Sequence, residues 1–163
     1  MYYHRSLIAV TIVILNFVMF ISLAEAQRQD FETRQCNVST YNAVHSSPEL
    51  GISSYDQKGI MQSTHESKLF DNWNLHLVGV QKREGKNYYL HGLSKEIGPD
   101  GEFIIWEFYT ESEVTTAKPI YGTGKWKGVK GERKSTLITT MNQVVPLVFP
   151  FCQKQVGWIE LPK

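Results

Sequence analysis

The sequence predicts an all-β protein, a single antiparallel barrel closed by about eight strands, with a β-sandwich as the alternative. Short segments of alternating apolar and polar residues are separated by turn sequences, such as Gly-Pro-Asp-Gly at residues 98–101, and this spacing is typical of barrels and sandwiches. No segment after residue 26 shows the apolar period of an amphipathic helix. Aromatic residues make up 12% of the chain, which suits a β-rich interior or an aromatic-lined cavity.

The first 26 residues have the pattern of a secretory signal peptide. His4 and Arg5 precede an apolar run over residues 7–23, and Ala-Glu-Ala at residues 24–26 supplies a small-x-small cleavage site. An uncleaved membrane anchor is the alternative, because an apolar run of about 17 residues is at the lower limit for crossing a bilayer. With cleavage the protein is exported, either periplasmic or secreted, and it contacts a membrane only if the N-terminal segment is retained.

Residues 27–163 then form one domain, which is long enough to bury a hydrophobic core. Its first part, residues 27–56, is expected to be partly irregular because it is polar and contains loop-forming residues. Alternating strands are expected from residue 70 onward. Residues 144–151 are apolar but contain two prolines, so we expect an extended strap over one end of the barrel there.

The two cysteines, Cys36 and Cys152, lie near opposite ends of residues 27–163. An exported protein meets an oxidising compartment, so a disulfide between them is expected, with two free thiols as the alternative. No histidine or further cysteine stands at metal-ligand spacing around either one, which argues against a metal site. Asn37 belongs to the glycosylation sequence Asn-Val-Ser, which matters only in a eukaryotic secretory pathway.

Charge and motifs exclude several function classes. The formal net charge of +1 gives no electrostatic basis for binding nucleic acid. The five histidines are scattered without an HxH or HExxH pattern, and no GxSxG occurs, so neither a metalloenzyme nor a serine hydrolase is indicated. No dinucleotide fingerprint or phosphate-binding loop is present. We therefore expect no metal and no cofactor.

A glycine-rich segment at residues 121–131 is predicted to be an interrupted strand. Its single large apolar side chain is Trp126, which is expected to point into the barrel. Gly124 and Gly128 fall on the same face as the indole and would be small to make room for it. The alternative is an exposed Trp126 at the barrel mouth, which would turn the face carrying Lys125 inward.

The sequence Gly-Thr-Gly-Lys-Trp-Lys-Gly-Val-Lys-Gly at residues 122–131 resembles a segment of the allene oxide cyclase and dirigent-like β-barrel proteins. It is also similar to a segment of small secreted bacterial proteins of unknown function. The resemblance covers roughly residues 70–139 and implies a closed barrel. It also implies a cofactor-free cyclase or isomerase as one candidate activity. The catalytic carboxylates, arginine and cysteine of the plant enzymes have no matching positions here, so no activity is carried over.

Glu107 is the candidate catalytic residue, because it sits in the apolar strand segment at residues 103–109. A carboxyl among such neighbours is either buried with a raised pKa, which suits general acid–base chemistry, or it faces water. Tyr88 and Tyr89 point to opposite faces, so one phenol is expected inside the barrel. The candidate ligand-binding residues are aromatic and histidine side chains of the predicted strands: Tyr89, His91, Trp106, Tyr109 and Trp126.

The sequence therefore predicts an exported small barrel that binds a small apolar or aromatic ligand in its interior. A cofactor-free cyclase or isomerase is the first alternative, so the question of enzymatic activity stays open. A structural or interaction protein of the cell envelope is the second alternative. The sequence identifies no ligand, and it leaves open whether the protein forms a homo-oligomer.

Overall fold

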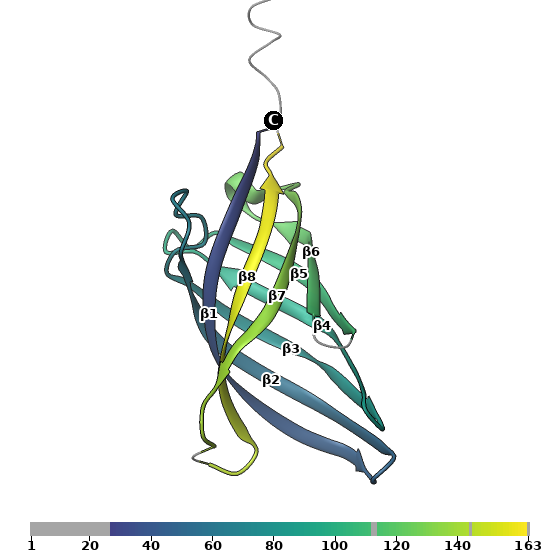
Figure 1. The fold of residues 1–163 in the computed structure, drawn as a ribbon. Coiled ribbons are helices and arrows are strands. Elements are labelled where there is room, and N and C mark those ends of the chain that lie inside the picture. Colours follow the sequence, from purple (N-terminus) through teal and green to yellow (C-terminus); the bar gives the residue numbers. More distant parts are fainter. Residues whose placement is uncertain (1–26, 112–113, 144, 163) are drawn as a thin grey trace, which may run out of the picture.

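The computed structural model describes residues 27–111, 114–143 and 145–162. Eight antiparallel strands close into one barrel in chain order (Figure 1), which confirms the predicted fold class. The signal-peptide interpretation of residues 1–26 lies outside the described residues. The strands are β1 (Arg28–Ser46), β2 (Leu50–Ser63), β3 (Trp73–Glu84), β4 (Asn87–Ile97), β5 (Phe103–Glu111), β6 (Val114–Gly122), β7 (Lys130–Thr140) and β8 (Val148–Glu160).

The pairing register fixes the shape of the barrel. Followed from strand to strand, the register that starts at Tyr41 on β1 returns to β1 at Phe31, ten residues away. A shear of this size with eight strands corresponds to a strand tilt of about 40°. Residues that pair across neighbouring strands therefore lie at successively different heights in the lumen.

Small residues in the lumen stand opposite large ones. On this register line Tyr55 pairs with Gly79 and Phe108 pairs with Gly92. A Cβ atom on Gly79 would lie 2.6 Å from the Tyr55 hydroxyl oxygen, and one on Gly92 would lie 2.8 Å from Cζ of Phe108. The glycines therefore leave the space that the two rings occupy, which is how a narrow barrel accommodates aromatic side chains.

The upper end of the barrel in Figure 1, where β1 begins and β8 ends, is closed by aromatic side chains. Phe70, from the connection between β2 and β3, packs against Phe31, Trp73 and Trp126, with ring centroids 4.6, 5.0 and 5.6 Å away. All four side chains are at most 5% exposed. Their burial provides a large share of the hydrophobic stabilisation, because each aromatic ring removes much apolar surface from water.

The glycine-rich segment differs from the predicted strand. β6 ends at Gly122, and Gly124–Trp126 form η1, a short 3-10 helix. The expected burial of Trp126 is confirmed, since its side chain is 2% exposed. Gly124 and Gly128 are needed for a different reason than expected: their φ angles are 53° and 80°, a left-handed conformation that favours glycine. Among the described residues no helix is long and apolar enough to span a membrane.

The N-terminal part is more regular than expected. Residues 27–56, expected to be partly irregular, carry β1 and the first half of β2. Between Phe31 and Tyr41 the inward face of β1 is polar, so hydrophobic alternation does not reveal this strand. The apolar strap expected at residues 144–151 is also replaced in part, because Val148–Glu160 forms β8 and its Pro150 lies opposite Val38. Residue 144 lies outside the described residues.

The predicted disulfide between Cys36 and Cys152 is confirmed. The two residues face each other across the pairing of β1 with β8, the first and last strands of the barrel. The sequence separation is 116 residues, for which the chain-entropy model gives a stabilisation of about 5 kcal/mol. No free cysteine remains among the described residues, and the disulfide is consistent with an oxidising, extracytoplasmic compartment.

Replacing Trp126 by alanine should lower the free energy of unfolding by about 3–5 kcal/mol, because it removes a ring from the centre of the aromatic cluster. Chemical denaturation followed by circular dichroism measures this loss. Tyr121→Ala is the matched control, since Tyr121 is 56% exposed and its truncation should cost less than about 1 kcal/mol. Equal losses for the two variants would contradict the proposed role of Trp126.

Candidate functional site

Polar side chains line the middle of the lumen. Four inward side chains of β1 are at most 2% exposed, namely Thr33, Gln35, Asn37 and Ser39. Three of them bond to glutamines of the two neighbouring strands. Thr33 Oγ1 donates to Gln155 Oε1 at 3.0 Å, and Ser39 Oγ donates to Gln57 Oε1 at 3.1 Å. The amide of Gln155 also donates to that of Gln35. Buried polar groups are costly without partners, so this network keeps a polar interior compatible with folding.

Four buried polar side-chain atoms lack a hydrogen-bond partner among the described residues: the indole nitrogens of Trp106 and Trp126, Nδ2 of Asn37 and the hydroxyl oxygen of Tyr55. The side chains of Asn37 and Tyr55 are 2% and 4% exposed. An unsatisfied buried donor or acceptor costs about 1–3 kcal/mol. Such groups in a native protein are normally satisfied by water or by a bound molecule, and Asn37 Nδ2 and the Tyr55 hydroxyl are the two such groups in the lower lumen.

A buried ion pair crosses the lumen above these atoms. Arg133 on β7 donates to Glu96 on β4 through both terminal nitrogens, with Nη1 2.8 Å from Oε2. Ser94 Oγ donates to Glu96 Oε1 at 3.0 Å, and the guanidinium carbon of Arg133 lies 4.3 Å from the centre of the Trp106 ring. Both charged side chains are at most 4% exposed. The two-bond contact fixes the geometry of the pair, and its opposite charges add no net charge to the lumen.

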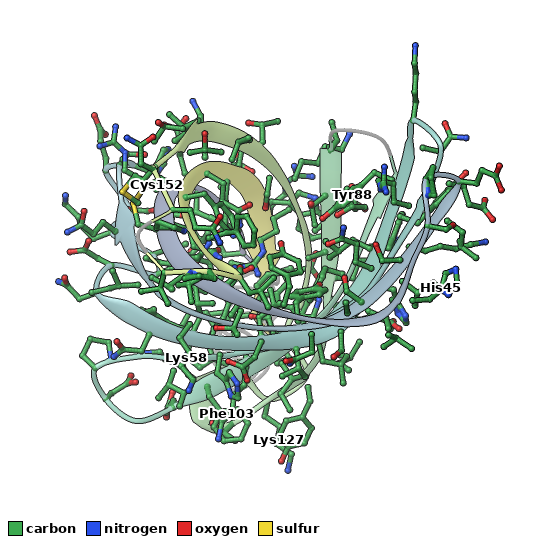
Figure 2. The ribbon with its side chains drawn as sticks, turned by 90° about the horizontal axis from the view of Figure 1, so that it is seen from below. His45, Lys58, Tyr88, Phe103, Lys127 and Cys152 are labelled. Carbon is green, nitrogen blue, oxygen red and sulfur yellow. A yellow bond between two sulfur atoms is a disulfide. The ribbon has the colours of Figure 1, made fainter. Side chains whose placement is uncertain are left out.

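Three tyrosines, Tyr41, Tyr55 and Tyr88, surround the lower part of the lumen and are called the tyrosine rim. The rings of Tyr41 and Tyr55 are 5.8 Å apart, and Tyr41 also packs on Phe149 at 5.2 Å. Figure 2 looks into this lower end, and Tyr88 lies on the inner side of the wall, whereas Cys152 lies on the outside. Tyr41 and Tyr88 are half-buried, so both side chains are partly exposed to solvent at this end.

Burial raises the pKa of each rim phenol above its usual value, because the charged phenolate is poorly solvated there. All three phenols are therefore neutral at physiological pH. Each neutral hydroxyl both donates and accepts a hydrogen bond. The rim consequently offers aromatic surface and neutral hydrogen-bonding groups.

The predicted ligand-binding residues fall into two separate groups. Trp106 and Trp126 are buried inside the barrel, at 0% and 2% exposure. Tyr89, His91 and Tyr109 instead lie on the outer wall, where they border a depression of about 510 Å³. Their other outward neighbours there are Ile52, Val80 and Lys82. Whether the predicted residues bind a ligand stays a prediction.

The alternation of β4 explains why Tyr88 rather than Tyr89 is the inward phenol. Even-numbered residues of this strand face the lumen, as the burial of Ser94 and Glu96 shows. Alternation places two adjacent tyrosines on opposite faces of the strand, but it does not say which of the two faces the lumen. Ser94 pairs with Trp106, and paired residues lie on the same face of the sheet. Once Trp106 is placed inside, the even-numbered residues of β4, including Tyr88, are therefore inside as well.

Glu107, the predicted catalytic residue, lies on the outer wall and faces water, in agreement with the alternative. Its Oε1 is 3.0 Å from Nε2 of His91 on the neighbouring strand, and both side chains are at least half exposed. The buried carboxylate of the lumen is instead Glu96. The sequence does not indicate that Glu96 is buried, because the inward face of β4, from Leu90 through Ser94 to Glu96, has no run of apolar residues.

Asn37, the asparagine of the glycosylation sequence, points into the lumen of the folded protein. Its side chain is 2% exposed and its Oδ1 accepts a hydrogen bond from Gln35 at 3.0 Å. A glycan on Asn37 is therefore incompatible with this fold. No three His, Cys, Asp or Glu side chains gather as metal ligands in the part of the chain that the structure describes.

No protein-family model matches the chain, and no curated protein matches it. Two solved structures do resemble it. The pterocarpan synthase dirigent protein GePTS1 is 7% identical with a TM-score of 0.53, and the match covers 87% of this chain and 96% of that one. The pterocarpan synthase dirigent protein PsPTS1 is 9% identical with a TM-score of 0.51, covering 85% of this chain and 99% of that one. At such low identity the likeness concerns the fold, and it supports the dirigent-like barrel expected from residues 122–131.

Breaking the buried ion pair should be strongly destabilising. Arg133→Met should cost about 3–5 kcal/mol of unfolding free energy, because it leaves the Glu96 carboxylate buried without a partner. The double variant with Glu96→Met should cost less, since no unpaired charge remains. Denaturant titrations measure both values. Glu107→Gln is the control from the exposed pair with His91, expected to cost less than about 1 kcal/mol; an equally small loss for Arg133→Met would refute the prediction.

Burial of the rim phenols should make the protein sensitive to alkali. A phenol in the unfolded chain has a pKa of about 10, and burial raises the pKa of Tyr55 in the folded protein. The contribution of Tyr55 to the free energy of unfolding is therefore complete below pH 10, the pKa in the unfolded chain. It is lost as the pH rises from there through the raised pKa of the folded protein. Tyr55→Phe should flatten the alkaline decline of unfolding free energy, whereas Tyr109→Phe, at a side chain 50% exposed, should not. Parallel declines for wild type and Tyr55→Phe would contradict this expectation.

Proposed function

We propose that the protein is an exported β-barrel that binds a small, uncharged aromatic ligand in the lower part of its lumen. The observation that carries this proposal is the pair of unpartnered buried groups, Asn37 Nδ2 and the Tyr55 hydroxyl, beside the half-buried Tyr41 and Tyr88. A ligand with a hydrogen-bond acceptor would satisfy the amide donor. The tyrosine rim would supply ring contacts.

The distribution of charge supports an uncharged ligand. The charges of Glu96 and Arg133 are paired with each other, and burial keeps the rim phenols neutral. A charged ligand would lose its hydration on entering the lumen without gaining a free counter-charge, and this desolvation is expensive. Selectivity for neutral molecules follows from that difference.

The aromatic cluster around Phe70 closes the upper end, so the proposed route of entry is the lower end. Export is proposed on two grounds. The first 26 residues have the composition of a signal peptide. The Cys36–Cys152 disulfide is of the kind that persists in oxidising compartments, such as a periplasm or the extracellular space.

A cofactor-free cyclase or isomerase remains the second candidate function. The buried carboxylate of Glu96 favours it, because such a reaction requires an acid–base group inside the barrel. Both oxygens of Glu96 already accept hydrogen bonds from Arg133, which leaves the carboxylate poorly placed to take a proton from a ligand. Binding without turnover is therefore the better-supported function, with the ion pair positioning the ligand by its local field.

Titration with the neutral fluorophore N-phenyl-1-naphthylamine tests the proposal. The fluorescence of the probe should rise on binding to the purified protein. Tyr55→Phe should weaken binding roughly 2- to 10-fold, the range expected for one hydrogen bond from the N–H of the probe to the Tyr55 hydroxyl oxygen. An anionic analogue of the probe, 1-anilinonaphthalene-8-sulfonate, should bind more weakly than the neutral one.

Tyr109→Ala is the matched control, because Tyr109 borders the depression on the outer wall and not the lumen. It should leave the affinity for the probe unchanged. If Tyr109→Ala abolished binding while Tyr55→Phe had no effect, the outer depression would be the binding site and the lumen proposal would be wrong. Absence of any fluorescence change with wild-type protein would also overturn it.

A further inference from the structure

The connection between β2 and β3, residues 64–72, has an unusual backbone at the upper end of the barrel (Figure 1). Three of its non-glycine residues, Lys68, Phe70 and Asn72, have positive φ angles of 52°, 61° and 57°. Asparagine tolerates this left-handed conformation, but for a lysine, and above all for a bulky phenylalanine, the conformation is strained. Such strain persists only where the surrounding structure imposes it, and it concentrates at ligand clamps and switch segments.

The strained connection is held at its base and by one deeply buried ring. The backbone N–H of Ser63 donates to Asp71 Oδ1 at 2.9 Å, which ties the two ends of the connection together. Residues 64–68 are exposed, and Phe70 alone is fully buried, with the half-buried Leu69 packed beside it on the same core. Packing of the Phe70 ring is therefore the main apolar contact that offsets the strain of this segment.

Phe70 packs on two indoles whose N–H groups have no acceptor. Its ring is nearly parallel to that of Trp126, with the centroids 5.6 Å apart and the planes at 27°, and it is steeply inclined to that of Trp106 at 6.2 Å. Both indole nitrogens lack a hydrogen-bond partner among the described residues, and both side chains are at most 2% exposed. A phenylalanine ring supplies packing but no acceptor, so the two buried donors stay unsatisfied, which costs free energy.

We propose that residues 64–72 form a lid and that Phe70 is a displaceable plug, which occupies a second ligand site at the upper end of the barrel. The ligand is a neutral aromatic molecule that carries a hydrogen-bond acceptor, such as an aryl ketone. It stacks on Trp126 as Phe70 does. Its acceptor receives a hydrogen bond from the N–H of Trp106, because the steep inclination of that indole directs an in-plane N–H toward a ring stacked on Trp126.

The electrostatic surroundings favour a neutral ligand at this site. The nearest charge is the Arg133 guanidinium, 4.3 Å from the centre of the Trp106 ring, and it is already paired with Glu96. A charged ligand would lose its hydration without gaining a free counter-charge. The site shares neither Asn37 nor Tyr55 with the lower lumen, so it goes beyond the function proposed above.

The backbone strain makes the exchange of plug and ligand energetically feasible. Opening the lid loses the packing of Phe70, but it relaxes the left-handed backbone at Lys68 and Phe70. The ligand then restores the stacking and adds a hydrogen bond. Because the ligand binds only the open form, its apparent affinity for the wild-type protein is lowered by the small fraction of molecules in which the lid is open.

Titration with 6-propionyl-2-(dimethylamino)naphthalene, a neutral aryl ketone whose emission shifts to shorter wavelength on leaving water, tests the proposal. Phe70→Ala should bind the ketone at least about tenfold more tightly than wild type, because the plug no longer competes. This gain should persist in the double variant with Tyr55→Phe, which separates the site from the lower lumen. Trp106→Phe should weaken ketone binding roughly 2- to 10-fold, the range for one hydrogen bond, and should affect the carbonyl-free analogue 2-(dimethylamino)naphthalene less.

Two substitutions at Lys68 test the lid without removing a buried side chain. Lys68→Gly relaxes the left-handed backbone in the closed form, so it should raise the midpoint of chemical denaturation and weaken ketone binding at least about twofold. Lys68→Ala is the matched control, because it removes the same ammonium group but keeps the Cβ atom, and it should change neither quantity. Should Phe70→Ala not fold, this pair decides the question.

Three results would overturn the proposal: equal ketone affinity for Lys68→Gly and Lys68→Ala, a folded Phe70→Ala variant without a gain in affinity, or equal effects of Trp106→Phe on the ketone and its carbonyl-free analogue.

Discussion

Closure of the sheet through the pairing of β1 with β8 is the constraint on which the rest of this structure depends. It brings Cys36 opposite Cys152, and it fixes the ten-residue shear that decides which side chain meets which in the lumen. Without closure, the polar inward face of β1 would have no partners on β8 and would not form a strand with a buried side. The disulfide stabilises the one strand pairing that links the two ends of the chain.

Stability and the proposed ligand binding depend on different levels of the same lumen. The aromatic cluster around Phe70 and Trp126 closes the upper end and buries enough apolar surface to support the fold. The level below can therefore tolerate the Glu96–Arg133 pair, whose desolvation makes it a weak source of stability compared with apolar packing. Lower still, Asn37 and Tyr55 leave polar atoms unsatisfied. Under the proposed function, a ligand at the lower end would satisfy these two groups.

The sequence predicted the barrel, the disulfide and the burial of Trp126, because each can be recognised from a short stretch or a residue type. Regularly spaced turns indicate the barrel, two cysteines in an export context indicate the disulfide, and one large indole among glycines indicates the buried tryptophan. It could not predict the polar lumen. Inward positions such as Gln35 and Glu96 look like outward ones when both faces of a strand are polar, and only strand pairing separates them. The side of Glu107 was equally hidden in the sequence, since its strand has apolar residues on both faces, and only the pairing of β5 places it outside.

The open edge of β7 follows from the same geometry that makes the lumen. A closed barrel normally removes all strand edges, but β6 begins only at Val114 and meets β7 at just three positions, so β8 is the only described strand that pairs with the lower half of β7. The consequence is a barrel that is closed around its aromatic upper end and incompletely paired around its tyrosine rim.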